Sequence, residues 1–420
     1  MILLIVLIIF SCIIFAFSSY IKNKNIYNPI TIFCSVWAFV TFLASLRLYG
    51  LYETSVKTYL VIWIGIISFV FGCSVLGRFQ LRVKVSSLGK ENEFTFNKNI
   101  IYIIILTATV ILIVTAYKSI NLLFSGHNLA YIRYIAQDEV MGSNNGLILI
   151  LFNYIAQPIC QLLIPLSALM YFSNNKDNKI IILSIIPIIL LVISNGGRFI
   201  LLYYVINFVF IGMILNAHIN ISNKLKRRIN VILLIVISII IYMTVARNGY
   251  TIGKSFYTYI CGCVPHLSLR LSNFDGLKKY TYGISSFQGF VRPIFSIITK
   301  IGITDNFPSL LQLAENLNNE VLSPIYIGEN LRYNAFVSLF YYFYIDFNLF
   351  GVVFLSMFYG YICKLFYYRA KKNGSNSNII AYSLLLQSIV TSMFRFQFSS
   401  FMFAMTFIYL FLIKPKKIKL

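Results

Sequence analysis

Long apolar runs separated by short polar connections make up most of this chain. A helix needs about 20 residues to cross the hydrocarbon core of a bilayer, and many of the runs approach that length. Residues 180–193 are almost continuously apolar, which excludes the alternating pattern of transmembrane strands. The pattern therefore predicts an all-α, polytopic membrane protein with about eleven transmembrane helices. The expected spans are Met1–Ile21, Pro29–Leu46, Val56–Gly77, Asn99–Tyr117, Gly146–Phe172, Ile180–Ser194, Phe199–Ala217, Ile229–Ala246, Leu349–Tyr368, Ile379–Phe394 and Phe396–Ile413.

Two segments depart from this pattern. Residues 247–333 form a long stretch that is too polar to cross a bilayer, and we expect one large extracytoplasmic loop there. Residues 334–345 are apolar but only about 18 Å long if helical, so they are predicted to form a short re-entrant or interfacial helix. The expected organisation is eight transmembrane helices in 1–246, the loop in 247–333, and the short helix, three further spans and a basic cytoplasmic tail in 334–420.

Charge agrees with the membrane assignment and sets an orientation. Only 11% of the residues are charged, against about 25% in soluble domains. The net charge of +23 does not indicate a nucleic-acid partner, because basic residues beside membrane helices are the ordinary topogenic signal. With the short basic connections and the tail in the cytoplasm, the helices run from an outer amino terminus to an inner carboxyl terminus. The 247–333 loop then lies outside.

Metal and nucleotide chemistry lack sequence support. The seven cysteines are scattered, and Cys261 with Cys263 form a C-x-C pair without further ligands. The chain has no P-loop, no H-E-x-x-H and no D-x-D glycosyltransferase motif. We therefore expect no metal and no cofactor.

Arginines are enriched on the predicted outer face. Eight of the 13 arginines lie there, whereas the lysines are mainly cytoplasmic. Topogenesis does not require this division, and a guanidinium binds phosphate through two hydrogen bonds, as an ammonium cannot. Helix anchoring is the alternative explanation. The candidates for binding a pyrophosphate are Arg198, which follows two glycines at a helix start, Arg395, which lies between two spans, and Arg247, Arg270 and Arg292 of the outer segment.

A general base has four candidates on the same face. His266 follows Cys263-Val264-Pro265 in the outer segment, and an imidazole that titrates near pH 6.5 can accept a proton from a sugar hydroxyl. Asp275, Glu329 and Asp346 are rival candidates. The alternative for each is an ordinary polar side chain without a catalytic role.

The chain resembles the Wzy-type oligosaccharide repeat-unit polymerases of O-antigen and capsule assembly. Two motifs carry the resemblance: Asn195-Gly196-Gly197-Arg198 at a helix start, and Asp346-Phe347-Asn348-Leu349-Phe350-Gly351, which is similar to a D-F-G-x-x-G pattern with Asn348 in place of the first glycine. The resemblance implies a multi-pass protein of the bacterial cytoplasmic (inner) membrane. It also implies glycosyl transfer between polyprenyl-pyrophosphate-linked oligosaccharides, with a flippase and chain-length regulator proteins as further partners.

Two other functions stay open at this stage. An O-antigen ligase uses the same donor chemistry with a lipid core as acceptor. A lipid-linked oligosaccharide flippase or other transporter is expected to place ionisable residues in mid-span and to contain repeats. The charges here gather at the predicted membrane faces, which favours an enzyme.

Overall fold

The computed structural model confirms the all-α class, because helices account for most of the described residues. Among these residues the strands form a single two-stranded antiparallel sheet. The structure describes residues 1–76, 96–126, 131, 147–173, 177–195, 197, 199–216, 227, 252–277, 279–303, 306–333 and 336–413. The chain divides into two compact units, the first comprising Met1–Val85, Thr251–Tyr368 and Leu385–Ser400, and the second Ser86–Tyr250, Arg369–Leu384 and Phe401–Leu420.

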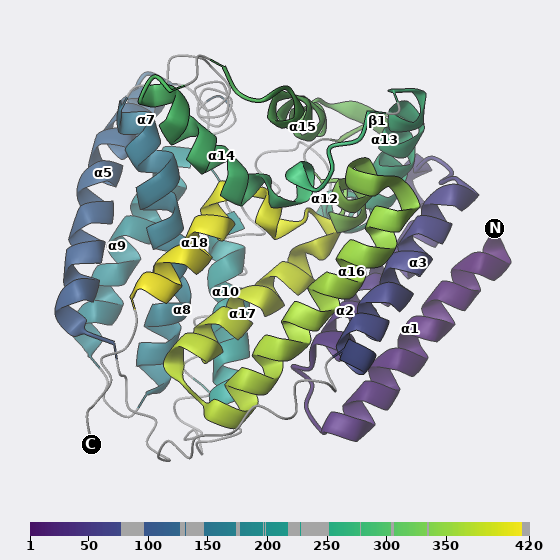
Figure 1. Ribbon diagram of the computed structural model, residues 1–420, viewed down its shortest axis with the longest axis horizontal. Helices are drawn as coiled ribbons and strands as arrows, with labels where there is room; N and C mark the ends of the chain where they lie inside the picture. The colour runs from purple at the N-terminus through teal and green to yellow at the C-terminus, as the bar shows by residue number, and fades with distance from the viewer. Residues whose placement is uncertain are drawn as a thin grey trace. The chain divides into compact units, whose positions relative to one another are not determined.

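Four helices of the first unit lie side by side (Figure 1). Their starts are set by local capping. The Asn28 side chain accepts a hydrogen bond from the Ile30 amide at 3.0 Å, and Pro29 occupies the first helical position, where its missing N–H costs nothing. Ser55 caps the next helix in the same way. The four helices are α1 (Ile2–Asn23), α2 (Pro29–Ser45), α3 (Val56–Phe71, continued by a π-helical turn over Gly72–Leu76) and α16 (Leu339–Asn373, which belongs to this unit as far as Tyr368).

Glycines allow α3 and α16 to approach each other closely. A Cβ atom at Gly72 would lie 2.0 Å from the Met357 carbonyl oxygen, and one at Gly360 would lie 2.2 Å from the Phe69 carbonyl oxygen. Backbone therefore contacts backbone at both positions, as in small-residue helix crossings within membranes. A side chain at either glycine would force the two helices apart.

The predicted outer loop is folded rather than irregular. Its described residues form four helices and a β-hairpin, which the polar composition of the segment did not indicate. The strands pair Tyr326 with Arg332, and the hairpin is extended by a bridge between Leu51 and Gly328. The elements are α12 (Ile252–Cys261), α13 (Cys263–Leu277), α14 (Ile284–Lys300), α15 (Ser309–Glu320), β1 (Ile325–Gly328) and β2 (Leu331–Tyr333).

These elements pack on the connection between α2 and α3. The Tyr257 hydroxyl of α12 donates to the Leu43 carbonyl at 2.7 Å and accepts from the Leu48 amide at 3.0 Å. The opposite end of the same unit holds the connection between α1 and α2, where Asn25 contacts the Tyr367 hydroxyl near the end of α16. The first unit thus has one end that carries the folded 252–333 segment and one end that carries Lys22 and Lys24.

Helix α16 contains a backbone break soon after its start. Phe347 has φ −147° and ψ 26°, and Asn348 has φ 58° and ψ −143°, so neither residue is helical. The break separates residues 339–346 from the long apolar stretch that follows. The short helix predicted for 334–345 therefore corresponds to the first turns of α16, while its place relative to a bilayer stays a prediction.

The second unit is built around α8, whose residues are almost all buried. Helix α18 packs on it, and the Thr406 hydroxyl donates to the Pro158 carbonyl at 3.1 Å. Helices α5 and α9 join through Ser119, which donates to the Ser194 carbonyl at 3.1 Å. The elements of this unit are α5 (Lys98–Phe124), α7 (Leu147–Leu151), a π-helical turn (Phe152–Ala156), α8 (Gln157–Phe172), α9 (Asn178–Asn195), α10 (Phe199–Asn216), the first part of α17 (Asn376–Val390) and α18 (Phe401–Leu412).

Six of the described helices are long and apolar enough to cross a membrane, which identifies a membrane protein by length and composition. Three shorter apolar helices, Pro29–Ser45, Phe199–Leu215 and Phe401–Leu412, accompany them. The total of eleven spans stays a prediction, since the expected span 229–246 lies outside the described residues. The expected span Ile379–Phe394 is a helix only as far as Val390, where a 3₁₀ turn over Thr391–Met393 follows.

Candidate functional site

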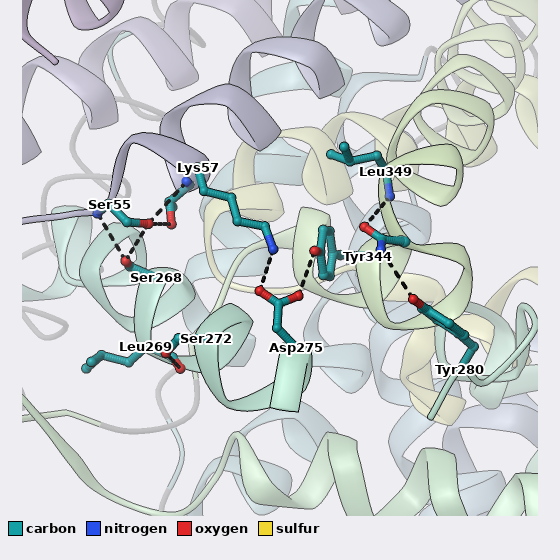
Figure 2. A network of polar contacts seen from close by, with 11 residues as sticks. Ser55, Lys57, Ser268, Leu269, Ser272, Asp275, Tyr280, Tyr344 and Leu349 are labelled. Atoms are coloured by element: carbon teal, nitrogen blue, oxygen red, sulfur yellow. Dashed lines mark hydrogen bonds and ion pairs between the residues drawn. The ribbon is translucent and has the colours of Figure 1, made fainter. Parts of the chain in front are cut away.

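A carboxylate, an ammonium and a phenol meet at the end of the first unit that carries the 252–333 segment. Asp275 lies in the last turn of α13, Lys57 in the first turn of α3, and Tyr344 just before the break in α16. The Lys57 ammonium forms an ion pair with one Asp275 oxygen, and the Tyr344 hydroxyl donates to the other at 2.8 Å (Figure 2). The ammonium also lies 5.0 Å from the centre of the Tyr344 ring.

Two serines set this geometry. Ser55 caps α3 by accepting from the Thr58 amide at 3.3 Å, and its own amide donates to the Ser268 hydroxyl of α13 at 3.1 Å. The Ser268 hydroxyl in turn donates to Ser55 Oγ at 3.0 Å (Figure 2). Asp275 follows Ser268 by seven residues, which is two helical turns on one face. The start of α3 therefore fixes α13 so that Asp275 reaches Lys57.

The Asp275 carboxylate has the access that proton transfer needs. Its side chain is 39% exposed, whereas the aromatic ring of Tyr344 is buried. Each carboxylate oxygen can accept more than one hydrogen bond, so the contacts with Lys57 and Tyr344 leave acceptor positions open. A carboxylate that is oriented by two donors and still reached by solvent can bind or deprotonate a hydroxyl.

His266 has a different environment. It is fully buried in α13; its Nδ1 lies 2.7 Å from the Phe336 carbonyl, and its Nε2 accepts from Arg270 Nε at 3.0 Å. These partners assign the proton to Nδ1, because Nε2 must accept. Burial lowers the pKa of His266 to about 4, with the adjacent Arg270 charge acting in the same direction. Both ring nitrogens are engaged in protein contacts, so the catalytic role predicted for His266 stays a prediction that this geometry does not favour.

Arg270 is part of the same buried network. Besides His266, its guanidinium donates to Glu320 at 2.8 Å and to both the carbonyl and the hydroxyl of Ser323, at 3.0 and 2.9 Å. These bonds join α13 to the end of α15 and the turn that follows. The guanidinium fork is directed at protein groups, so the predicted role of Arg270 in binding a pyrophosphate stays a prediction that this geometry does not favour.

Asp346 is a structural carboxylate in this fold. It is fully buried and accepts hydrogen bonds from the Ser285 amide at 3.1 Å, the Ser286 amide at 3.0 Å and the Thr281 hydroxyl at 2.5 Å. Unpaired amides at a helix start favour an anion, so Asp346 caps α14 from the neighbouring helix. Through these hydrogen bonds Asp346 joins α16 to α14. Its predicted role as a base stays untested.

The remaining arginines differ in their surroundings. Arg292 of α14 forms an ion pair with Glu315 of α15 at 2.8 Å. Arg395 is half-buried after the 3₁₀ turn that ends α17, and within the described residues its buried Nε atom has no hydrogen-bond partner. Such an atom is suited to an anionic ligand. Arg198 and Arg247 lie outside the described residues, so their predicted contacts stay predictions.

The Asp346–Gly351 motif has a structural explanation at each of three positions. Asp346 caps α14, as described above. Asn348, which replaces a glycine of the pattern, has a positive φ of 58°, a conformation that glycine adopts without strain. A Cβ at Gly351 would lie 2.0 Å from the Phe343 carbonyl oxygen. The motif therefore encodes the break in α16 and its junction with α14.

Several residues of the site were not identified from the sequence. Lys57 was not singled out, although its position two residues after a capping serine places it in the first turn of a helix. Tyr344 falls within the segment 334–345 that was predicted as a re-entrant or interfacial helix, and the sequence gives no signal for the partners Glu315 and Glu320. A polar residue in a first helical turn beside a folded outer segment is the signal that identifies Lys57.

Comparison with protein families, characterised proteins and solved structures adds no assignment. No family model matches the chain, and no match is found among curated proteins or among solved structures. Within the part of the chain that the structure describes, no group of three His, Cys, Asp or Glu side chains is arranged to hold a metal ion. The seven cysteines are all free and buried. The site geometry and the sequence motifs are therefore the basis for assigning a function.

Proposed function

We propose that the chain polymerises polyprenyl-pyrophosphate-linked oligosaccharide repeat units into a surface polysaccharide at the outer leaflet of a bacterial cytoplasmic membrane. The observation that carries the proposal is the half-exposed Asp275 carboxylate, oriented by Lys57 and Tyr344 at one end of apolar helices. A lipid-linked substrate brings its reacting pyrophosphate to this level of a membrane. The Asp346–Gly351 motif supports the same family of reactions.

The orientation within the membrane is part of the proposal. Lys22 and Lys24 lie at the end of the first unit opposite to the 252–333 segment, and Lys371 and Lys372 end α16. This separation agrees with the positive-inside rule if the end that carries 252–333 is extracytoplasmic. Asp275 then faces the compartment in which lipid-linked repeat units are joined.

The reaction that this site supports is a glycosyl transfer without a metal. An acceptor hydroxyl oxygen forms a bond to the anomeric carbon of the donor glycan. The bond from that carbon to the pyrophosphate oxygen breaks, and its electron pair leaves with the pyrophosphate. The hydroxyl proton passes to Asp275, whose orientation Lys57 and Tyr344 fix. Arginine side chains stabilise the charge that develops on the leaving group, with Arg395 as the described candidate and Arg198 and Arg247 as the sequence-based ones.

Purified protein with a lipid-linked repeat unit tests the assignment of the base. Asp275→Asn keeps the size of the side chain and removes the acceptor of the proton, so turnover should fall roughly 10²- to 10⁴-fold. Asp177→Asn is the matched control, because Asp177 also pairs with a lysine, Lys98 at 3.1 Å, but lies in the second unit and on the predicted cytoplasmic face. Full turnover by Asp275→Asn at normal protein abundance removes Asp275 from the mechanism.

The cellular experiment separates the related functions. We expect deletion of the gene to leave surface glycan as a single repeat unit on lipid, because donor synthesis and export continue. A long polymer that is left unattached would indicate a ligase instead. Loss of all surface glycan would indicate a flippase, and either of these outcomes overturns the polymerase assignment.

A further inference from the structure

Helix α14 is packed with its polar face toward the protein. Ser285 donates to Asn318 of α15 at 2.7 Å, Gln288 accepts from the same asparagine, and Arg292 pairs with Glu315 at 2.8 Å. Residues 285, 288 and 292 recur at the spacing of one helical face. The face that would meet water in an ordinary amphipathic helix is therefore bound to α15.

The other face of α14 carries an apolar stripe. Phe290, Ile294, Ile297 and Ile301 follow one another at intervals of three or four residues, the spacing of one helical face, and Ile301 comes just after the end of the helix. Phe290, at the start of the stripe, packs on Phe398 with ring centres 5.8 Å apart. The three isoleucines beyond it are 57%, 60% and 68% exposed. An isoleucine stripe of this kind on the outer side of a helix needs an apolar cover.

The start of α14 lies beside an apolar surface of α16. Tyr282, which precedes α14, contacts the ring of Phe347 with centres 6.0 Å apart. Phe347 is followed along α16 by Phe350 and Phe354, which are 74% and 59% exposed and lie on a helix long enough to span a bilayer. The start of α14 therefore lies beside the face of α16 that lipid must cover, and the apolar stripe begins about two turns further along α14.

We propose that α14 is an interfacial helix, with Ile294, Ile297 and Ile301 inserted into the boundary between headgroups and acyl chains of the bilayer. Its polar face holds α15 on the water side, through Glu315 and Asn318. A tyrosine at one end of such a helix suits the headgroup region. The inference concerns membrane contact alone, so it stands whether or not the chain catalyses glycosyl transfer.

A second copy of the chain is a poorer occupant of this stripe. A stable protein–protein interface buries about 1,200–2,000 Å² in total. Three isoleucines in a single row, flanked by α15 on the polar side, offer only a narrow strip. A bilayer surface covers such a strip without requiring any complementary shape.

Spin labelling tests the proposal in nanodiscs that hold one copy of the protein. Single cysteines replace Ile294, Ile297 and Ile301 in a background without the native cysteines, and collisions with oxygen and with a water-soluble nickel chelate are measured. Oxygen concentrates in lipid, whereas the chelate stays in water. We expect the three labels to match a label at Phe354 of α16, and a label at the exposed Ser272 of α13 to show the reverse.

A second measurement avoids the cysteine background. Ile297→Trp is made in the natural chain, and its fluorescence is compared with that of the parent, which has two tryptophans, in ordinary and in brominated lipids. Additional emission that is quenched by shallow acyl-chain bromines supports membrane insertion. Labels that the chelate reaches freely would show that the stripe faces water. Labels that neither reagent reaches would show that protein covers it, and either result overturns the proposal.

Discussion

Asn348 adopts a backbone conformation that is unfavourable for a residue with a Cβ atom. Its φ of 58° and ψ of −143° lie in a region that glycine occupies readily and other residues rarely. The conformation is retained because the side chain accepts from the Leu349 amide at 2.8 Å and contacts the Tyr280 hydroxyl. The break in α16 therefore stores local strain beside the candidate site.

Replacing Asn348 by glycine should stabilise the protein. The substitution removes the steric cost of the positive φ, which is about 1–3 kcal/mol, and we expect this to exceed the added entropy of the unfolded chain together with the two side-chain contacts that are lost. We expect a net gain of roughly 1 kcal/mol, measured as a higher midpoint of thermal unfolding in detergent. Asn348→Ala is the control and should lower the midpoint, since it keeps the strain and loses both side-chain contacts. A lower midpoint for Asn348→Gly would show that those contacts outweigh the strain.

For single residues, the sequence indicated which positions are important better than it indicated what each residue does. The Asp346–Gly351 motif was recognised, and Asp346 was predicted as a base, a role that stays untested. Three hydrogen-bond donors from α14 and the residues before it surround the carboxylate. Burial and partners that lie about 60 residues away along the chain determine this environment. A single sequence gives no access to either quantity.

At the scale of elements, the network of His266 and Arg270 holds α13 to the end of α15. Burial keeps the imidazole neutral and lowers its pKa to about 4, while the unfolded chain has a histidine pKa near 6.5. Between pH 6.5 and pH 4 the unfolded state binds a proton that the folded state does not bind. The stabilisation that neutral His266 contributes is therefore fully present above pH 6.5 and is lost as the pH falls toward 4. The loss from this one group is on the order of 3 kcal/mol.

Unfolding measurements at a series of pH values between 7 and 4 test this expectation. His266→Gln removes the titrating ring, so the variant should be less stable at pH 7 but should lose less of its stability on acidification. The difference between the two pH profiles is the relevant quantity, because other groups titrate in both proteins. Parallel profiles would contradict the assignment of acid sensitivity to His266.

Observed helix starts agree with the predicted ones for helices that consist of long apolar runs. The starts of α1, α2, α3 and α10 lie within one residue of the predicted ones, because long apolar runs and capping residues mark them. The helices within 252–333 were missed as helices. Their polar faces bind other protein elements, as Ser285 and Arg292 of α14 do, so polarity did not indicate exposure to water.

At the scale of the whole molecule, the proposed orientation predicts which ends reagents reach. Single cysteines are placed at Asn273 on α13 and at Lys22 and Lys371, all exposed, in a background without native cysteines. A membrane-impermeant maleimide should label Asn273→Cys in intact cells, and should label the other two only after the membrane is opened. The reverse pattern would place Asp275 in the cytoplasm and would remove the basis of the proposed function.

The pairing of Lys57 with Asp275 also belongs to this scale. The two residues are separated by 218 positions and come together only because α13 folds over the start of α3. Helix counting and charge bias predict on which side of the membrane each residue lies, and they assign Lys57 and Asp275 to the same side. They do not predict which residues on one face touch, since that depends on how the outer segment folds.

The close crossing of α3 and α16 has a mechanical consequence. Because backbones touch at Gly72 and at Gly360, the two helices cannot slide or separate without opening a void, and they act as a single stiff rod. Lys57 is carried by the α3 part of that rod, whereas Tyr344 precedes the break at Phe347 and Asn348 and is not part of it. Asp275 is carried by α13, which Ser55 and Ser268 join to the start of α3. The rod is therefore a rigid support for the ion pair between Lys57 and Asp275.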